Sequence, residues 1–203
     1  MLMNEENPLD LVSLLYEWSK EEAEKHQREL GTFWVVDLVR CPLKRDFERK
    51  YPELSSSLIF RPNLLLGRLV HLGLEKLLSE RVEDVRVEVE GEREVYVETG
   101  KVKVRGRIDI IIGEIGIEIK TARADFSMPQ QHHVDQLRAY NWLFDLSGGI
   151  LIYVTPDRIA QYEVMETMEE GEIKERILSD KAPRYDWECV YCIYNVLCPQ
   201  KRG

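Results

Sequence analysis

Asp109, Glu118 and Lys120 stand close together in the segment GRIDIIIGEIGIEIK, residues 106–120. Alternating apolar and polar residues predict two strands joined by a tight turn, and a loop at Glu114 and Ile115 would set Asp109 opposite Lys120. The period of two then gives a polar face and an apolar face, formed respectively by Asp109, Ile111, Glu118 and Lys120, and by Ile108, Ile110, Ile112, Ile117 and Ile119. Buried charges are costly unless they are paired or bind a metal. The hairpin therefore indicates either a cross-strand Asp109–Lys120 ion pair on a solvated face or a site for a divalent cation.

Two further pairs of polar residues have the i, i+4 spacing that places side chains on one face of a helix. His71 and Glu75 form the first pair, and Gln136 and Tyr140 form the second. Taken singly, His71 could be a core histidine on a leucine-rich helix, and Gln136 and Tyr140 could be surface residues. The order of all these residues along the chain is more informative than any pair alone.

The ordered patterns GxxxHxxxE, GxxD, ExK and QxxxY resemble the RecB-like branch of the PD-(D/E)xK nuclease superfamily. The matching residues are Gly67, His71, Glu75, Gly106, Asp109, Glu118, Lys120, Gln136 and Tyr140. One departure is Ile108, which stands where the superfamily name has Pro, at a position that is loose in the family. The resemblance runs from about residue 35 to the end of the chain, and it implies a restriction-endonuclease-like mixed sheet flanked by helices.

A carboxylate-rich site suits Mg2+ or Mn2+, because both are hard cations that prefer oxygen ligands. Asp109 and Glu118 are therefore the expected ligands. The resemblance implies two more, the backbone carbonyl of Ile119 and the imidazole of His71. An imidazole ligand favours Mn2+ over Mg2+, because it is softer than a carboxylate.

The remaining motif residues have roles in phosphodiester hydrolysis. Lys120, held beside the metal, would position or deprotonate the attacking water and stabilise developing charge. The resemblance implies that Gln136 and Tyr140 contact the nucleic-acid backbone and order the site. Glu75 could support His71 as an outer partner.

Four cysteines occur, Cys41 and then Cys189, Cys192 and Cys198. Four cysteine thiolates can bind a structural zinc or an iron–sulfur cluster. The alternative is that the four cysteines are separate buried residues without a metal. Zinc sites usually have two close pairs, whereas here only Cys189 and Cys192 are so spaced. Cys41 and Cys198 each precede Pro, as in ferredoxin-like cluster loops. The spacing thus favours an iron–sulfur cluster, and the thiolate count together with the two Cys-Pro steps favours 4Fe-4S over 2Fe-2S.

One cysteine before the nuclease motifs and three after them narrow the resemblance to iron–sulfur members, and most closely to the CRISPR-associated exonuclease family. The cluster would join segments near 35–50 and 183–203 as an appendage of an α/β fold. The aromatic residues among these cysteines have two interpretations, stacking on single-stranded bases or packing around the cluster. They are Tyr185, Trp187, Tyr191 and Tyr194.

The resemblance implies a metal-dependent 5′-to-3′ exonuclease that acts on single-stranded DNA and trims it before spacer integration into a CRISPR array. It also implies CRISPR integrase proteins as partners, and a ring-shaped homo-oligomer is an open alternative to a monomer. Two other functions stay open from the sequence, a RecB-like repair nuclease outside CRISPR and a non-catalytic iron–sulfur DNA-binding adaptor.

The composition is that of a globular protein, with 203 residues, 44% hydrophobic residues and a formal net charge of −9. We expect one nuclease domain over 1–203. The opening residues lack a basic signal segment, and no apolar run is long enough to span a bilayer, so we expect a cytoplasmic protein without membrane contact.

The net negative charge argues against a protein that coats nucleic acid over its whole surface, because such proteins are strongly basic. Acids concentrate at 80–98 and 163–180, however, whereas 40–50 and 101–123 are basic and could receive a phosphate backbone.

Hydrophobic periodicity outlines the elements that must position these residues. It predicts helices at 9–30, at 63–80 with Asn63 as N-cap, at 129–146 and at 166–179. Strands are expected at 85–90, 94–98, 101–105, 106–112, 115–121, 149–155 and 158–164, with turns at Gly91 and Gly100. This order predicts an α/β domain with a mixed sheet, followed by an irregular cysteine-bearing segment.

Overall fold

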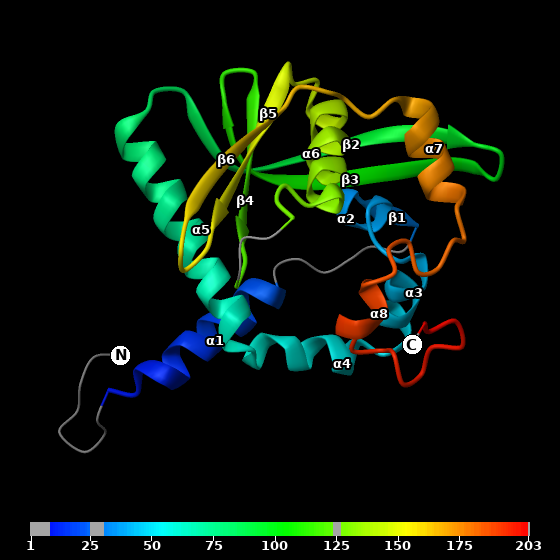
Figure 1. The fold of residues 1–203 in the computed structure, drawn as a ribbon, viewed down its shortest axis with the longest axis horizontal. Helices are drawn as coiled ribbons and strands as arrows, with labels where there is room; N and C mark the ends of the chain where they lie inside the picture. Colours follow the sequence, from blue (N-terminus) through cyan, green and yellow to red (C-terminus); the bar gives the residue numbers. More distant parts are fainter. Residues whose placement is uncertain (1–8, 25–30, 124–126, 203) are drawn as a thin grey trace.

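The computed structural model describes residues 9–24, 31–123 and 127–202, and Figure 1 shows their arrangement. Within this part of the chain the strands are β1 (Thr32–Trp34), β2 (Val85–Val97), β3 (Gly100–Ile112), β4 (Ile115–Thr121), β5 (Gly148–Val154) and β6 (Ile159–Val164). They form one sheet in the order β1-β3-β4-β5-β6, and β2 pairs with β3 beside this path. The β1–β3 and β4–β5 pairs are parallel, and the others are antiparallel. The predicted mixed sheet is confirmed.

Strand β3 is the centre of a fork in this sheet. One of its edges pairs with β2 over nearly its whole length. On its other edge, β1 pairs with residues 103–105 and β4 pairs with residues 110–112. Residues 106–109 thus lie between two partner strands that diverge, and Asp109 stands at this fork.

The apolar side chains on the two faces of the sheet pack against different helices. Helix α5 (Pro62–Arg81) covers Ile110, Ile117 and Ile119 with its own Val70, Leu74 and Leu78. Helix α6 (Gln131–Phe144) covers the opposite face, where Leu137 and Leu143 belong to the larger core with residues of β3 and β5. Figure 1 shows the two helices on either side of the strands.

The remaining helices complete the described fold. They are α1 (Leu11–Glu24), α2 (Val35–Leu38), α3 (Pro42–Lys50), α4 (Pro52–Ser56), the 3-10 helix η1 (Ser57–Phe60), α7 (Glu170–Leu178) and α8 (Glu188–Tyr191). Proline occupies the first position of α3, α4 and α5, where its missing N–H costs no helical hydrogen bond. Helices α3 and α8 lie side by side although they are far apart in the sequence (Figure 1). No described helix is long and apolar enough to cross a membrane.

The turn between β3 and β4 corrects the predicted register. The loop consists of Gly113 and Glu114, not Glu114 and Ile115, because Gly113 supplies the positive φ (+57°) that a tight hairpin loop needs. Ile111 therefore lies opposite Gly116, and the predicted pairing of Asp109 with Lys120 was wrong.

The predicted division of the hairpin into two faces also fails around Asp109, whose carboxylate lies toward His71 of α5, whereas Glu118 and Lys120 are bonded to Gln136 of α6. Ile110, Ile117 and Ile119 share a face as expected, but Ile108 lies with Ile111 in the core beneath α6. The alternation breaks at Asp109, opposite Glu88, whose φ of +48° is rare for a residue with a side chain. The β2–β3 pairing also skips these two residues.

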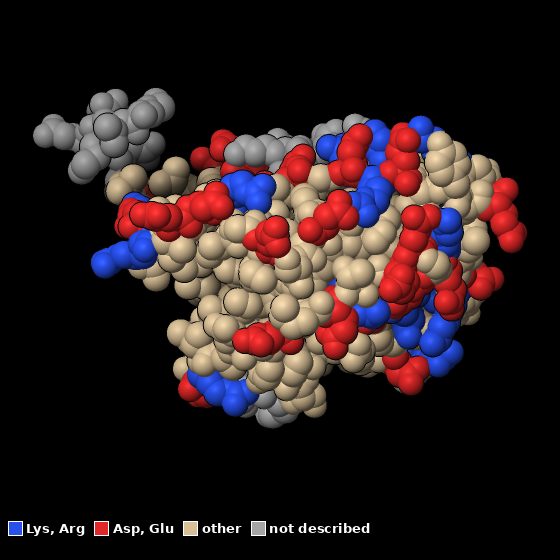
Figure 2. All heavy atoms as spheres, turned by 90° about the horizontal axis from the view of Figure 1, so that it is seen from above, with Lys and Arg blue, Asp and Glu red and all other residues tan. Residues whose placement is uncertain are grey.

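The long β2–β3 hairpin neutralises much of the basic segment at 101–123. Cross-strand ion pairs join Lys101 to Glu94 and Lys103 to Glu92 at 3.0 Å. Arg105 lies 3.6 Å from Glu90, and Arg107 lies 3.2 Å from Glu88. Acidic and basic side chains also lie intermixed on the face shown in Figure 2. The expectation that this whole segment is available to phosphate is therefore corrected, because four of its bases pair with acids of β2.

The other predicted elements differ from the observed ones in smaller ways. The predicted strands at 85–90 and 94–98 are one strand, so Gly91 lies within β2 and not at a turn. The N-cap of α5 is Arg61, not Asn63. Helix α3 within the basic segment 40–50 was not predicted. The first helix is seen over Leu11–Glu24, and the rest of its predicted range, 25–30, lies outside the described residues.

Candidate active site

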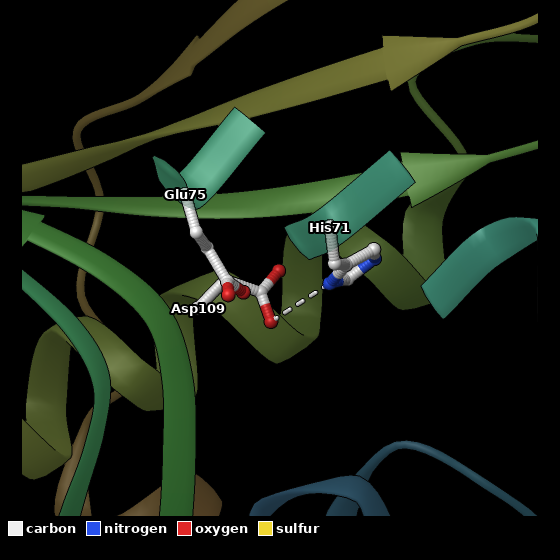
Figure 3. Close-up of side chains that lie close together, drawn as sticks. All are labelled: His71, Glu75 and Asp109. Atoms are coloured by element: carbon white, nitrogen blue, oxygen red, sulfur yellow. Dashed lines mark ion pairs between the residues drawn. The ribbon is translucent and has the colours of Figure 1, made fainter. Parts of the chain in front are cut away.

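A histidine and two carboxylates converge at the fork of the sheet. His71 and Glu75 extend from one face of α5, and Asp109 extends from β3 toward them (Figure 3). One potential ligand atom from each of these residues lies within 4.8 Å of the others. His71 Nδ1 lies 3.3 Å from Asp109 Oδ1. The arrangement therefore combines an imidazole with two oxygen donors.

The electrostatics of this cluster favour a bound positive charge. Burial raises the pKa of Glu75, and the nearby carboxylates of Glu88 and Asp109 raise it further. Burial alone would lower the pKa of His71, but the hydrogen bond and charge of Asp109 outweigh this effect and raise the pKa. The carboxylates thus repel one another, and a cation would relieve that repulsion.

The carboxylate of Asp109 also fixes the strand beside it. Asp109 Oδ2 accepts the backbone N–H of Ile119 at 2.6 Å. The regular pairing of β3 with β4 ends at Ile110 and Ile117. Beyond that pair, the side chain of Asp109 provides the acceptor for the N–H of Ile119 in β4. This contact holds β4 close to the fork and leaves Asp109 Oδ1 toward His71.

On the other side of the fork, Glu118, Lys120 and Gln136 form a closed triangle of hydrogen bonds. Lys120 Nζ donates to Glu118 Oε1 at 2.8 Å and to Gln136 Oε1 at 2.9 Å. Gln136 Nε2 donates to Glu118 Oε1 at 3.0 Å. Tyr140, one turn further along α6, donates its hydroxyl to the carbonyl of Arg107 at 2.7 Å. The predicted pair Gln136 and Tyr140 thus supports both β3 and β4.

The surroundings of Glu118 disfavour the ionised form of its carboxylate. Burial, followed by the charge of Asp109, raises its pKa to about 7, although Lys120 opposes this shift. Its second oxygen, Oε2, is buried and has no hydrogen-bond partner in the described part of the chain. A buried carboxylate oxygen without a partner is costly, so this atom is suited to a ligand.

The ligand-forming cluster opens into a cavity of about 500 Å³. Besides His71, Glu75 and Asp109, its walls include Arg68, Arg107, Thr121 and residues of α1 such as Trp18. Arg68 donates to the carbonyl and hydroxyl oxygens of Ser19 at 2.5 and 2.7 Å. Helix α1 is thereby attached to the rim of this cavity.

All four cysteines line a second cavity of about 570 Å³, and each is a free thiol. Burial raises the pKa of Cys41, and the neighbouring Glu188 and Cys198 add to this shift. Lys120 and Gln136 line the same cavity. The cysteine site therefore adjoins the triangle of Glu118, Lys120 and Gln136.

The carboxylate of Glu188 connects the two ends of the described chain at this cavity. Its Oε1 accepts the N–H of Cys41 at 2.6 Å. Its Oε2 accepts the N–H groups of Arg184 and Tyr185 at 2.8 and 2.9 Å. One side chain thus joins the segment that carries Cys41 to the segment that carries the other three cysteines.

Comparison with known proteins now places the chain in a family. It is 42% identical to the CRISPR-associated exonuclease Cas4 of Saccharolobus solfataricus (strain P2), over 94% of this chain and 98% of that protein. The chain belongs to the Cas4 family of CRISPR-associated exonucleases. No protein-family model matches the sequence. The crystal structure of SSO0001 is similar to the whole fold, with a TM-score of 0.91 and 41% identity over 97% of this chain and all of that one.

Membership of the Cas4 family confirms the resemblance drawn from the motifs and makes the chain a CRISPR-associated nuclease. It favours this function over a repair nuclease outside CRISPR. The structure brings His71 and Asp109 together at one cavity, and Glu118, Lys120 and Gln136 beside another. Ile119 adjoins Asp109 through its N–H.

Two residues of these cavities were not predicted from the sequence, and the role of a third was underestimated. Glu75 was expected only to support His71, yet its carboxylate lies in the ligand-forming cluster itself. Glu188 and His132, which both line the cysteine cavity, were not singled out. The i, i+4 spacing could have given Glu75 equal weight with His71. No short-range pattern links Glu188 to Cys41, because they are 147 residues apart.

Proposed function

We propose that this chain is a Mn2+- or Mg2+-dependent deoxyribonuclease that degrades single-stranded DNA from the 5′ end, carries an iron–sulfur cluster and prepares DNA for CRISPR spacer acquisition. The observation that supports it best is the convergence of two carboxylates and an imidazole at the fork, together with a buried carboxylate oxygen of Glu118 that has no hydrogen-bond partner among the described residues.

The residues at the fork fit a divalent cation. Asp109 and Glu75 supply oxygens and His71 supplies nitrogen, while Glu118 Oε2 is a buried oxygen without a hydrogen-bond partner in the part of the chain that the structure describes. These residues, with the carbonyl of Ile119, would hold the ion. Once bound, it would polarise the scissile phosphate and favour deprotonation of the attacking water.

The remaining steps depend on side chains whose positions are fixed by hydrogen bonds. Lys120 Nζ is held by Glu118 and Gln136, so its charge stays beside the fork, where it can orient the water and neutralise the developing charge of the phosphate. Gln136 is held in turn by Glu118 and lies near Tyr140, whose hydroxyl fixes the carbonyl of Arg107. This rigid support keeps the lysine from moving when the substrate binds.

The direct test is cleavage of single-stranded DNA labelled at either the 5′ or the 3′ end, with Mn2+ and with EDTA. We expect metal-dependent release of the 5′ label first, and loss of at least about a hundredfold in rate for Lys120→Ala. Lys101→Ala is a matched control, because Lys101 pairs with Glu94 on the surface of the β2–β3 hairpin. Activity that survives in Lys120→Ala would refute the assignment of this lysine.

The four thiols fit a cluster because they line a single cavity and none is in a disulfide. Cys41, Cys189, Cys192 and Cys198 would provide a complete set of thiolate ligands, and we favour 4Fe-4S. A structural role is the simplest, since the ligands come from both ends of the described chain. Protein purified without oxygen should be brown and contain iron, and colourless protein with stoichiometric zinc would refute the iron–sulfur proposal.

The role in spacer acquisition implies association with CRISPR integrase proteins. Its support is membership of the family of CRISPR-associated exonucleases. Co-purification of the separately tagged proteins tests it, and failure to associate in the presence and absence of DNA would argue against it.

A further inference from the structure

A row of rings leads from the core to the rim of the cysteine cavity. Tyr153 of β5 is fully buried, and its hydroxyl lies 2.7 Å from His133 Nδ1. The ring of His133 lies 4.0 Å from that of His132, which lies 4.7 Å from that of Trp187. Tyr191 continues the row, 6.4 Å beyond Trp187. The inner rings therefore fix the position of the outer ones.

The outer rings are partly or largely exposed at the rim of the cavity. Trp187 is 44% exposed and Tyr191 is 74% exposed, although large aromatic side chains contribute most to stability when buried. Tyr185 stacks on one side of Trp187 with an angle of 17° between the ring planes. His132, Trp187 and Tyr191 all line the cavity that contains Lys120 and Gln136.

The charges of this cavity complement a phosphate chain. Its walls include Lys44, Lys120 and Lys201, whereas the protein as a whole has a net charge of −9. The carboxylate that lines it, Glu188, is occupied by three backbone N–H groups. Burial, with a contribution from Lys120, lowers the pKa of His132 to about 4, so its ring is neutral at physiological pH.

The cavity is also adjacent to the proposed reaction site. Leu64 lines both this cavity and the one that contains His71, Glu75 and Asp109. Lys120 and Gln136 form the wall between the rings and the buried Glu118. A chain of nucleotides that follows the rings would thus arrive at the fork.

We propose that Trp187, Tyr191 and His132 form a stacking platform for unpaired bases of single-stranded DNA, which holds the strand while its phosphate lies at the fork. This inference rests on the proposed function, and it assigns the part of the substrate next to the cleaved bond. Lys44 and Lys201 would contact the phosphates of the stacked nucleotides. Aromatic stacking accepts any base, so the platform would hold the strand without selecting a sequence.

The test measures binding without cleavage. A short fluorescent oligothymidylate is titrated with the full protein in EDTA, and anisotropy reports the affinity. Trp187→Ala should weaken binding on the order of tenfold, since stacking of one base on an aromatic ring corresponds to about 5- to 150-fold. Trp187→Phe should retain most of the affinity. Tyr96→Ala is the control, because Tyr96 is an exposed aromatic residue of β2 that does not line the cavity.

The contribution of the bases is separated by an oligonucleotide with the same backbone and abasic sites. Wild type should lose affinity for it, whereas Trp187→Ala should lose little more. Equal losses in both proteins, or normal binding of oligothymidylate by Trp187→Ala, would overturn the platform. Iron content and visible absorbance show whether each variant keeps its cysteine site, and Trp187→Phe decides the question if Trp187→Ala does not.

The two proposals can fail separately. Wild-type protein that binds oligothymidylate through Trp187 but never cleaves it would refute the nuclease mechanism and leave the platform intact. Normal cleavage together with unchanged binding by Trp187→Ala would refute the platform alone.

Discussion

The carboxylate of Asp109 accepts the backbone N–H of Ile119 at 2.6 Å, at the point where strands β3 and β4 separate. A single side chain thus has two tasks, because its other oxygen faces His71. The backbone of β4 and the ligand-forming cluster are coupled through this residue. Changes at Asp109 should therefore affect both stability and catalysis, and the two effects can be separated.

Asp109→Asn and Asp109→Ala should lose metal-dependent cleavage to the same extent, at least about a hundredfold, since both remove the charge. Their stabilities should differ. Asn can still accept the N–H of Ile119, whereas Ala leaves that group without its partner, at a cost of about 1–3 kcal/mol. Urea denaturation of the metal-free proteins measures the difference. Equal stabilities would show that the hydrogen bond contributes nothing.

Glu118 should make the stability of the metal-free protein depend on pH. Its pKa is raised to about 7 in the folded state, so between about pH 4.5 and 7 the folded protein binds more protons at this site than the unfolded chain. The free energy of unfolding should therefore fall as pH rises through this window, by up to about 1.4 kcal/mol per pH unit. Glu118→Gln should lack this contribution. Denaturant titrations of both proteins at several pH values provide the measurement, and parallel pH profiles would contradict the assignment.

Glu188 should be required to assemble the cysteine site. Glu188→Gln replaces one acceptor oxygen with a donor, so the N–H of Cys41 or those of Arg184 and Tyr185 lose their partner. We expect a loss of at least about 1.5 kcal/mol in the free energy of unfolding, and a lower iron content after reconstitution. Asp186→Asn is the matched control, since this exposed residue pairs only on the surface with Arg202 at 2.7 Å. Normal iron content in Glu188→Gln would exclude a positioning role.

Gly106 should be intolerant of a side chain. A Cβ atom there would lie 2.7 Å from Tyr140 Cε1 and 2.8 Å from Leu143 Cδ2, so α6 would have to move away from the fork. Gly106→Ala should cost about 1–3 kcal/mol and reduce cleavage by displacing Tyr140. Gly171→Ala in α7 is the control, because no atom of the described residues beyond its chain neighbours and its own helix backbone lies within 4 Å of the added Cβ. Thermal denaturation of both variants checks this, and a fully stable Gly106→Ala would contradict it.

The sequence predicted the elements of the site better than their contacts. The isoleucines of β3 and β4 indicated two strands and most of their faces, because burial on one side leaves a period of two. The register was wrong because the positive φ falls on Gly113, and the shift of Ile108 coincides with an irregular conformation of Glu88 in another strand. Helix α3 was missed because PLKRDFERK is mostly charged, although Leu43 and Phe47 have the i, i+4 spacing of a helix face and Pro42 marks its start.

Contacts between residues far apart in the sequence could not be predicted from local patterns. The motifs ordered His71, Asp109 and Lys120 along the chain, but the distribution of Lys120 and His71 between two cavities depends on how α5 and α6 pack on opposite faces of the sheet. Likewise, the pairing of the basic segment with the acids of β2 follows from the hairpin register. Composition alone could not show which bases are neutralised.

The bond between Glu188 and Cys41 joins positions 147 residues apart, and nearly the whole sheet lies between them in the sequence. Closing so large a loop has an entropic cost that is recovered only when the intervening strands have paired. The four thiols should therefore come together late in folding, after the core and the fork have formed. Proximity of Cys41 to the other cysteines is then a reporter of completed folding, which cross-linking of the thiols during refolding would follow in time.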